Sequence, residues 1–245
     1  MATFINTYAN EISKHLDYLI SWPINIDVKL GDVGILENGV FKRTDTLENL
    51  DIVKPKARKS RGEANLEYTS KNGVAVEFDP NIATHGIGTK MDIKFNREGA
   101  VFLRMGDHIS TQFESTDQLG RDIIEQFNNH NWRRDRVIVT EVISSANATI
   151  LVSGSNNATA SLLLDISLPA AEAIGKGKFA QSIGFTGSFG AKIIGANVSP
   201  LIRICGLKRK LFGNDFRSAS NDLKSSNTDP IEFSRIDSYH DLIDS

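Results

Sequence analysis

The stretch FAQSIGFTGSFGAKI, from Phe179 to Ile193, decides the fold class of this chain. Large apolar residues occupy one parity of this stretch and small or weakly polar residues occupy the other, which predicts an extended strand with one buried face. The alternation lasts longer than an average strand, so we expect a bend or a turn near Gly187. The apolar parity consists of Phe179, Ile183, Phe185, Phe189 and Ile193.

The surrounding region carries very little charge. Between Val142 and Leu207, a run of 66 residues, six charged residues interrupt a sequence in which Ser, Ala, Gly, Asn and Thr alternate with Ile, Leu, Val and Phe. This composition predicts β-structure with one apolar face and one small, weakly polar face. Segments 148–153 and 158–166 flank the turn residues Gly154 to Asn157, which indicates a hairpin.

The upstream half has a similar strand pattern. Asn38-Gly39 and Asn72-Gly73 each separate two short strand-like segments, and Asn-Gly supplies the two positive-φ residues of a type I′ turn, so we expect two hairpins. The remaining expected strands are a pair at 91–95 and 100–105, a central strand at 136–144 and a last strand at 200–207. The basic segment 54–61 is expected to be an exposed loop.

Three segments have helical periodicity. The first is residues 3–20, which ends before Pro23. The second follows a capping box formed by Ser115 and Gln118. The third is residues 229–245, where Asp229-Pro230 provides a helix start and Phe233, Ile236 and Ile243 lie on one helical stripe.

These elements together predict an α+β fold dominated by antiparallel β-hairpins, in a meander sheet with an N-terminal, a central and a short C-terminal helix. We expect one β-rich domain over residues 1–212, a flexible linker over 213–228 and an amphipathic C-terminal helix over 229–245. The linker prediction depends on its Ser, Asn and Asp content. The C-terminal helix would either dock on the domain or cover a surface until its release.

The amino-acid composition restricts the classes of protein to which this chain could belong. The chain has 245 residues, of which 40% are hydrophobic, so it can bury a core, and its net charge of −2 provides no general attraction to nucleic acid or acidic lipid. A single cysteine, Cys205, fits a reducing compartment and an inert core thiol. The sequence shows no signal peptide and no run of about 18 apolar residues, so we expect a cytoplasmic protein.

Catalytic motifs are absent from the sequence. It has no P-loop, no dinucleotide-binding glycine pattern, no paired-cysteine metal pattern and no nucleophile elbow, so we expect no enzyme activity, no cofactor and no metal. The alternative is a hydrolase that uses Asp107, His108 and Glu141. Glu141 lies inside an apolar strand, where a carboxylate needs a partner, so we expect an ion pair with Arg133, Arg134 or Arg203.

Two basic clusters are the candidate anion contacts. Neither is interleaved with the exposed aromatic residues that nucleic-acid binding usually adds, so a solvated loop is the simplest interpretation. Between the two anionic partners, lipid is favoured over nucleic acid, because the small-residue hairpins could contact a membrane. The clusters consist of Lys54, Lys56, Arg58, Lys59, Arg61, Lys208, Arg209 and Lys210.

The sequence therefore favours a non-enzymatic binding, assembly or effector module. Its small-residue hairpins would contact a partner or a membrane, since a membrane-spanning strand needs about ten residues that are apolar on one side and small or polar on the other. Pore formation with the C-terminal helix as an inhibitory cover is one form of this hypothesis. A self-contained soluble sheet, as a homo-oligomer that buries the small-residue face, is the other. Nucleic-acid binding through residues 54–61 remains an alternative.

Overall fold

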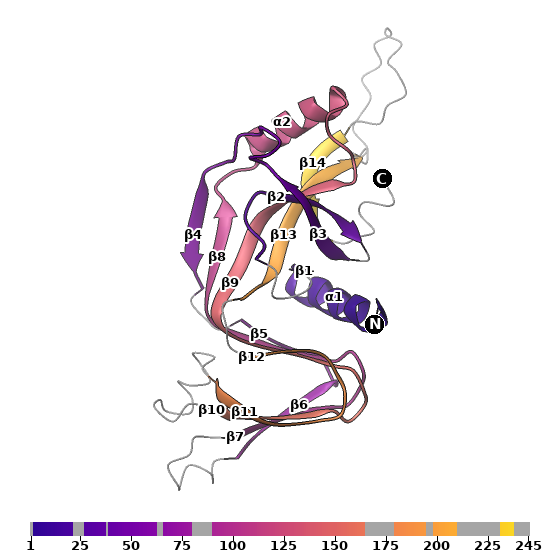
Figure 1. Ribbon diagram of the computed structural model, residues 1–245, viewed down its shortest axis with the longest axis vertical. Coiled ribbons are helices and arrows are strands. Elements are labelled where there is room, and N and C mark those ends of the chain that lie inside the picture. Colours follow the sequence, from indigo (N-terminus) through magenta and orange to yellow (C-terminus); the bar gives the residue numbers. More distant parts are fainter. Residues whose placement is uncertain are drawn as a thin grey trace, which may run out of the picture.

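The computed structural model describes residues 2–21, 27–37, 39–62, 66–79, 90–164, 179–194, 198–209 and 231–237. These residues form two helices and two β-sheets, which confirms a β-rich α+β fold (Figure 1). The helices are α1 (Ala2–Leu16) and α2 (Asp117–Asn128). Sheet A contains β1 (Leu19–Ser21), β2 (Asp32–Glu37), β3 (Val40–Thr46), β4 (Ala57–Arg61), β5 (Leu66–Thr69), β8 (Val101–Phe113), β9 (Arg136–Ser153), β12 (Phe189–Ile194), β13 (Val198–Arg209) and β14 (Ile231–Ile236). Sheet B contains β6 (Val74–Asp79), β7 (Lys90–Phe95), β10 (Thr159–Leu164) and β11 (Phe179–Thr186).

Part of sheet A closes on itself. The pairing order β13-β1-β3-β2-β9 is completed by direct pairing of β9 with β13, so five strands form a closed ring. Only the β1–β3 contact in this ring is parallel. One apolar cluster belongs to the ring strands and their neighbours, and it includes Leu36, Phe41, Val139, Ile202 and Ile204. The predicted hairpin around Asn38-Gly39 is confirmed as β2 and β3, with Gly39 at φ 77°.

The C-terminal helix prediction is wrong for the described residues. Residues 231–236 form β14, which pairs antiparallel with β13 from Ile204↔Ile236 to Arg209↔Ile231. Phe233 packs beside Gly120 of α2, whereas Ile236 joins the cluster of the closed ring, so both faces of this segment are covered. Hydrogen bonding to the β13 edge therefore overrides the local helix signals. Residues 213–228, the predicted linker, and Ile243 lie outside the described residues.

The other two helices are confirmed with different ends. Helix α1 stops at Leu16, and Leu19, which falls inside the predicted helix 3–20, instead lies in β1. Helix α2 begins after Thr116, whose side chain makes no capping hydrogen bond. The expected capping box is therefore not formed, and Ser115 Oγ instead accepts a hydrogen bond from the amide of Asp117 at 3.1 Å. Another apolar cluster, including Leu119, Ile123 and Trp132, joins α2 to the upper part of sheet A.

Three predicted strand pairs connect the two sheets instead of forming hairpins. Strand β5 pairs with β8 in sheet A and β6 pairs with β7 in sheet B, so the segment around Asn72-Gly73 is not a hairpin turn. The pairs β7/β8 and β9/β10 are divided between the sheets in the same way. The strands themselves occur where they were expected, and the pairing partners differ. The basic segment 54–61 also contains a strand, β4, although all its residues are exposed as predicted.

Candidate functional site

The most distinctive feature of the fold is a line of four corners at which the chain passes between the sheets. They are residues 70–73 (β5 to β6), 96–100 (β7 to β8), 154–158 (β9 to β10) and 187–188 (β11 to β12). Figure 1 shows the strands of the lower part folding over on one side of the molecule. Each corner contains one residue in the left-handed region, and these are Asn72 (φ 56°), Gly99 (φ 73°), Asn157 (φ 63°) and Gly187 (φ 84°).

The two layers that meet at the corners have the same strand order. The lower end of sheet A runs β12-β9-β8-β5, and sheet B runs β11-β10-β7-β6. The bend expected near Gly187 is thus confirmed, and it is one of four bends in the same line. The lower part of the protein is therefore a single four-stranded antiparallel sheet, folded over so that one half covers the other.

The folded sheet buries an apolar layer between its halves. Met91, Ile93 and Phe95 from β7 and Leu162 from β10 are fully buried there against Phe102 and Leu151 of sheet A. Phe95 and Phe189 come from opposite halves, and their rings meet edge to face with centroids 5.6 Å apart. Such contacts are the main stabilisation of the closed arrangement.

The outer face of sheet B is polar. Its cross-strand rows run Thr186–Thr159–Lys94–Ala75 and Gly184–Ser161–Asp92–Glu77. The charged groups are paired along this face: Lys94 Nζ lies 2.7 Å from Glu77 Oε2, and Lys90 Nζ lies 2.8 Å from Asp92 Oδ2. Sheet B therefore has one apolar and one small or charge-paired face, the alternation that the sequence predicted for the region after residue 142.

One buried cation lies on the face of sheet A that turns toward sheet B. Arg104 is on the same parity of β8 as Phe102 and is 6% exposed. Its Nη2 lies 3.5 Å from Glu67 Oε2, and its Nε has no hydrogen-bond partner among the described residues. Burial lowers the pKa of this guanidinium. A buried charge with incomplete hydrogen bonding destabilises the closed arrangement.

Helix α1 contacts the corners from the opposite face of sheet A. The carboxylate of Glu11 accepts hydrogen bonds from Tyr68, from Ser70 Oγ at 3.0 Å and from Arg97 Nη2 at 2.5 Å. Burial alone would raise the pKa of Glu11, but these hydrogen bonds and the charge of Arg97 outweigh it and hold the pKa below its ordinary value. Glu11 thus joins the helix to two of the four corners.

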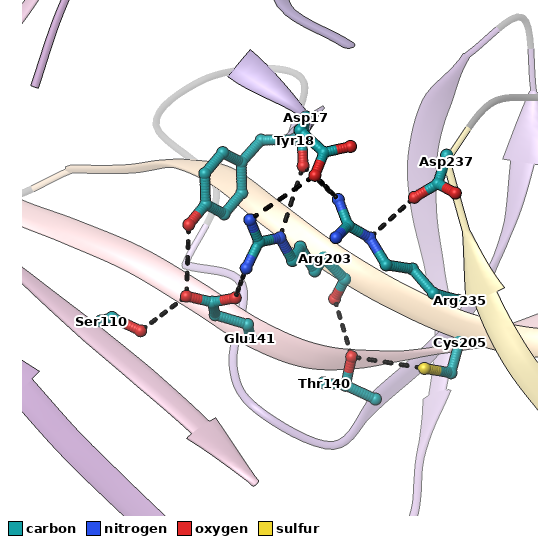
Figure 2. A network of polar contacts seen from close by, with 9 residues as sticks. All are labelled: Asp17, Tyr18, Ser110, Thr140, Glu141, Arg203, Cys205, Arg235 and Asp237. Carbon is teal, nitrogen blue, oxygen red and sulfur yellow. Dashed lines mark hydrogen bonds and ion pairs between the residues drawn. The ribbon is translucent and has the colours of Figure 1, made fainter.

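Glu141 has the ion pair that its position in an apolar strand required (Figure 2). Its Oε2 lies 2.7 Å from Arg203 Nη1, and its Oε1 accepts hydrogen bonds from Ser110 at 2.7 Å and Tyr18 at 3.3 Å. Arg203 was one of the three expected partners. Its guanidinium also lies over the Tyr18 ring, 4.2 Å from the ring centroid.

This network extends to the last strand. Arg235 of β14 lies 2.7 Å from Asp17 Oδ2 and also bonds to Asp237, while Arg203 donates to the Asp17 carbonyl oxygen at 3.4 Å. Figure 2 shows Cys205 at the margin of the network, with its thiol 3.7 Å from Thr140 Oγ1. Burial raises the pKa of that thiol, which fits the expected inert core cysteine.

The hypothetical hydrolase residues lie in two places. His108 is paired with Ser145, whereas Glu141 is paired with Gln112, four positions further along β8. Asp107 forms an ion pair with Arg61 at 2.6 Å. Burial lowers the pKa of His108, whose ring lies directly against Gly62. Within the described ranges, no group of three His, Cys, Asp or Glu side chains could hold a metal ion.

The residues predicted to contact a membrane or a partner have different surroundings in the structure. Phe185 and Phe189 are half-buried between the layers, with ring centroids 5.3 Å apart. Ile193 packs on the opposite face of sheet A, toward α1, because a register shift at 189–191 changes the parity. The side chains of Phe179, Ile183, Arg209 and Lys210 lie outside the described part of the structure.

The basic segment 54–61, which contains β4, is extensively paired. Lys54 contacts Glu48 at 3.0 Å, Lys56 contacts Glu114 at 3.1 Å and Arg61 contacts Asp107. Arg58 can donate to the Gln112 side-chain oxygen at 2.9 Å. Much of the positive charge in this segment is therefore balanced by neighbours. Lys59 shares the exposed edge, and Lys208 is half-buried near the end of β13.

Sequence reasoning predicted the bend at Gly187 but missed the other three corners, Glu11 and Arg104. The corners are preceded or accompanied by turn residues that equally suit hairpins, so only the pairing partners distinguish the two arrangements.

Comparison with known proteins provides no further guidance: no protein-family model matches the chain, and no curated protein is significantly similar to it. Among the described helices, neither has the length and apolar character required to cross a membrane.

Proposed function

We propose that this protein is a non-enzymatic, membrane-inserting effector whose working part is the folded-over sheet. The hairpins β6–β7 and β10–β11 would swing out at the four corners and enter a bilayer. The observation that supports the proposal is that the two layers have the same strand order and are joined strand by strand at the four corners. Because all four strands bend along one line, extending every corner would convert two short layers into one long, regular antiparallel sheet.

Strand length supports this proposal. The continuous runs 66–79, 90–113, 136–164 and 179–194 each exceed the roughly 9–11 residues that a tilted strand needs to cross the hydrocarbon core. The face of sheet B that now covers sheet A would contact lipid. The outer face, with its small residues and its Lys–Asp and Lys–Glu pairs, would face water, which is the alternation of membrane-spanning strands.

The same geometry is compatible with a sandwich that stays closed and presents its small-residue face to a partner, because corners also join ordinary packed sheets. The two functions differ in one measurable respect. The first requires the layers to separate, and the second does not.

A crosslink across the fold distinguishes them. Lys192 Nζ lies 4.6 Å from the centroid of the Phe185 ring in the folded arrangement, although an extended strand would separate these positions by about 23 Å. The test variant carries Phe185→Cys and Lys192→Cys in a Cys205→Ser background. It is treated with a short bifunctional thiol reagent, and the untreated variant is the matched control.

Release of an encapsulated dye from vesicles is the measurement. We expect the wild-type chain and the untreated variant to release dye, and the crosslinked variant to lose release. Vesicles with and without phosphatidylserine show whether the basic strand contributes through anionic lipid. Equal release by crosslinked and untreated protein would refute opening at the corners, and no release by any form would refute membrane insertion.

A further inference from the structure

The folded-over sheet has two open edges. Strand β6 pairs with β7 on one side, and β11 pairs with β10 on one side, so these two strands form the edges of sheet B. The corresponding edges of the covered layer are β5 and β12. No other strand in the described ranges occupies the outer side of any of these four segments.

The two edges run in opposite directions. The chain passes from sheet A to sheet B along β5 and β6, and it returns from sheet B to sheet A along β11 and β12. If the β6 edge of one copy lies beside the β11 edge of another, the new pair is antiparallel. The up-and-down alternation then continues without interruption from one copy to the next.

Insertion into lipid makes such pairing necessary. An unpaired backbone N–H or C=O group costs several kcal/mol in the hydrocarbon core, so an inserted sheet cannot keep open edges. Four strands are too few to close, since the smallest closed membrane sheets have about eight. One copy therefore cannot satisfy its own edges.

We propose that copies of this chain assemble head to tail, with the β5/β6 edge of one copy pairing with the β11/β12 edge of the next. The inference rests on the proposed function, and the partner is a second copy of the same chain. Unlike edges meet at every contact, so the interface is heterologous, and a ring closes only when its last copy meets the first. At least two copies are needed.

The side chains at the two edges are compatible with this contact. On the polar face, the β6 edge carries Ala75 and Glu77, and Glu77 is already paired with Lys94. The β11 edge carries Gly184 and Thr186, with open space around the Gly184 position. Among these four residues no like charges oppose each other, and small side chains let the backbones approach.

Single-cysteine mixing tests the pairing. In a Cys205→Ser background, one preparation carries Ala75→Cys and a second carries either Gly184→Cys or Thr186→Cys. Residues 75 and 186 are the two ends of one cross-strand row, and a register offset between copies that keeps the polar face moves the contact toward residue 184. The full-length proteins are mixed with phosphatidylserine vesicles, oxidised, and analysed without reductant while dye release is recorded.

We expect disulfide-linked dimers in at least one mixture of unlike edges, at least tenfold more than in either preparation alone. A chain with Ala75→Cys and the reactive partner cysteine together should form a ladder of larger multimers. Dye release with crosslinks between like edges, or with no crosslink in either mixture, would overturn the head-to-tail assembly and leave the proposed function standing. No dye release from wild-type protein would refute the proposed function itself.

Discussion

Glu141 and Arg203 show how a charged pair is accommodated inside a β-rich core. The Glu141 carboxylate is 8% exposed and the Arg203 side chain is 30% exposed, so the two partners are unequally buried. Arg203 also has Asp17 and the Tyr18 ring as neighbours, whereas Glu141 has two hydroxyl donors. Removal of one partner therefore has unequal consequences.

We predict that Arg203→Leu destabilises the fold more than Glu141→Leu. The first change leaves a buried carboxylate without its cation and should cost about 3–5 kcal/mol. The second leaves Arg203 with Asp17 and should cost about 1–2 kcal/mol. The double variant should recover part of the loss, and urea unfolding measures all three. Equal losses in the two single variants would contradict this asymmetry.

At the scale of single residues, the sequence predicted those contacts whose need follows from a residue's immediate neighbours in the chain. A lone carboxylate inside Val-Thr-Glu-Val-Ile demands a partner, and arginines were the available cations. The burial of Arg104 was not predictable from the sequence. Other polar residues also occur along its strand, and the burial of its guanidinium depends on a second layer that the strand pattern does not reveal.

At the scale of the elements, the corner at residues 70–73 differs from a hairpin turn in its backbone conformation. Asn72 has a positive φ, but Gly73 does not, so this Asn-Gly pair cannot form the type I′ turn that its sequence suggests. A left-handed residue costs roughly 1–2 kcal/mol for most side chains, and Asn tolerates it better.

We predict that Asn72→Val destabilises the closed sheet by about 1–2 kcal/mol, because a β-branched residue disfavours positive φ. Asn96→Val is the matched control, since Asn96 is exposed at the adjacent corner without a positive φ, and it should change stability by less than about 0.5 kcal/mol. Urea unfolding provides the comparison. If the corners open in membranes, Asn72→Val should also accelerate dye release by about 5–30-fold. Similar behaviour of both variants would argue against strain at this corner.

The last strand is part of the fold, so its loss should weaken the protein. Phe233 is half-buried against Gly120 of α2. We predict that Phe233→Ala lowers the free energy of unfolding by about 1–3 kcal/mol, less than for a fully buried Phe. Ser234→Ala on the opposite face is the control and should be neutral or slightly stabilising, because Ser234 Oγ is buried without a hydrogen-bond partner among the described residues. Thermal unfolding measures the stability of both variants. An unchanged Tm in Phe233→Ala would show that β14 contributes little to the stability of the fold.

Across the whole molecule, α1, the lower end of sheet A and sheet B form three layers, and Glu11 connects the first of them to two corners. Its pKa is lowered in the folded state, so its stabilising contribution is present above the ordinary value of 4.5 and is lost as the pH falls through the folded-state pKa.

We therefore predict that Glu11→Gln costs about 1–2 kcal/mol at pH 7 and much less at a pH below the folded-state pKa of Glu11, where the wild-type carboxylate is itself protonated. Urea unfolding at the two pH values measures the difference. His15 stacks on Tyr68 with ring centroids 5.6 Å apart, and His15→Gln is the control variant for this neighbouring contact. A pH-independent loss in Glu11→Gln would contradict the assigned role.

The global arrangement was only partly predictable. Alternation of apolar and small residues located most strands, because it reflects burial on one face of the pleat. It could not select partners, because a strand that folds over a corner and a strand that enters a hairpin bury the same face. The C-terminal strand was missed for a related reason: Phe233 and Ile236 fit a helical stripe equally well until the free edge of β13 is available.

Strand β9 belongs to the closed ring at one end and to the folded-over layer at the other, and it pairs with β2, β8, β12 and β13 along its 18 residues. Amide exchange should therefore divide within this one strand. Protons near Val137–Val142 would be among the slowest to be replaced by deuterium, while those near residue 153 would follow the faster breathing of the corners. If the layers separate in a membrane as proposed, we expect the ring to stay intact while the rest of the molecule rearranges.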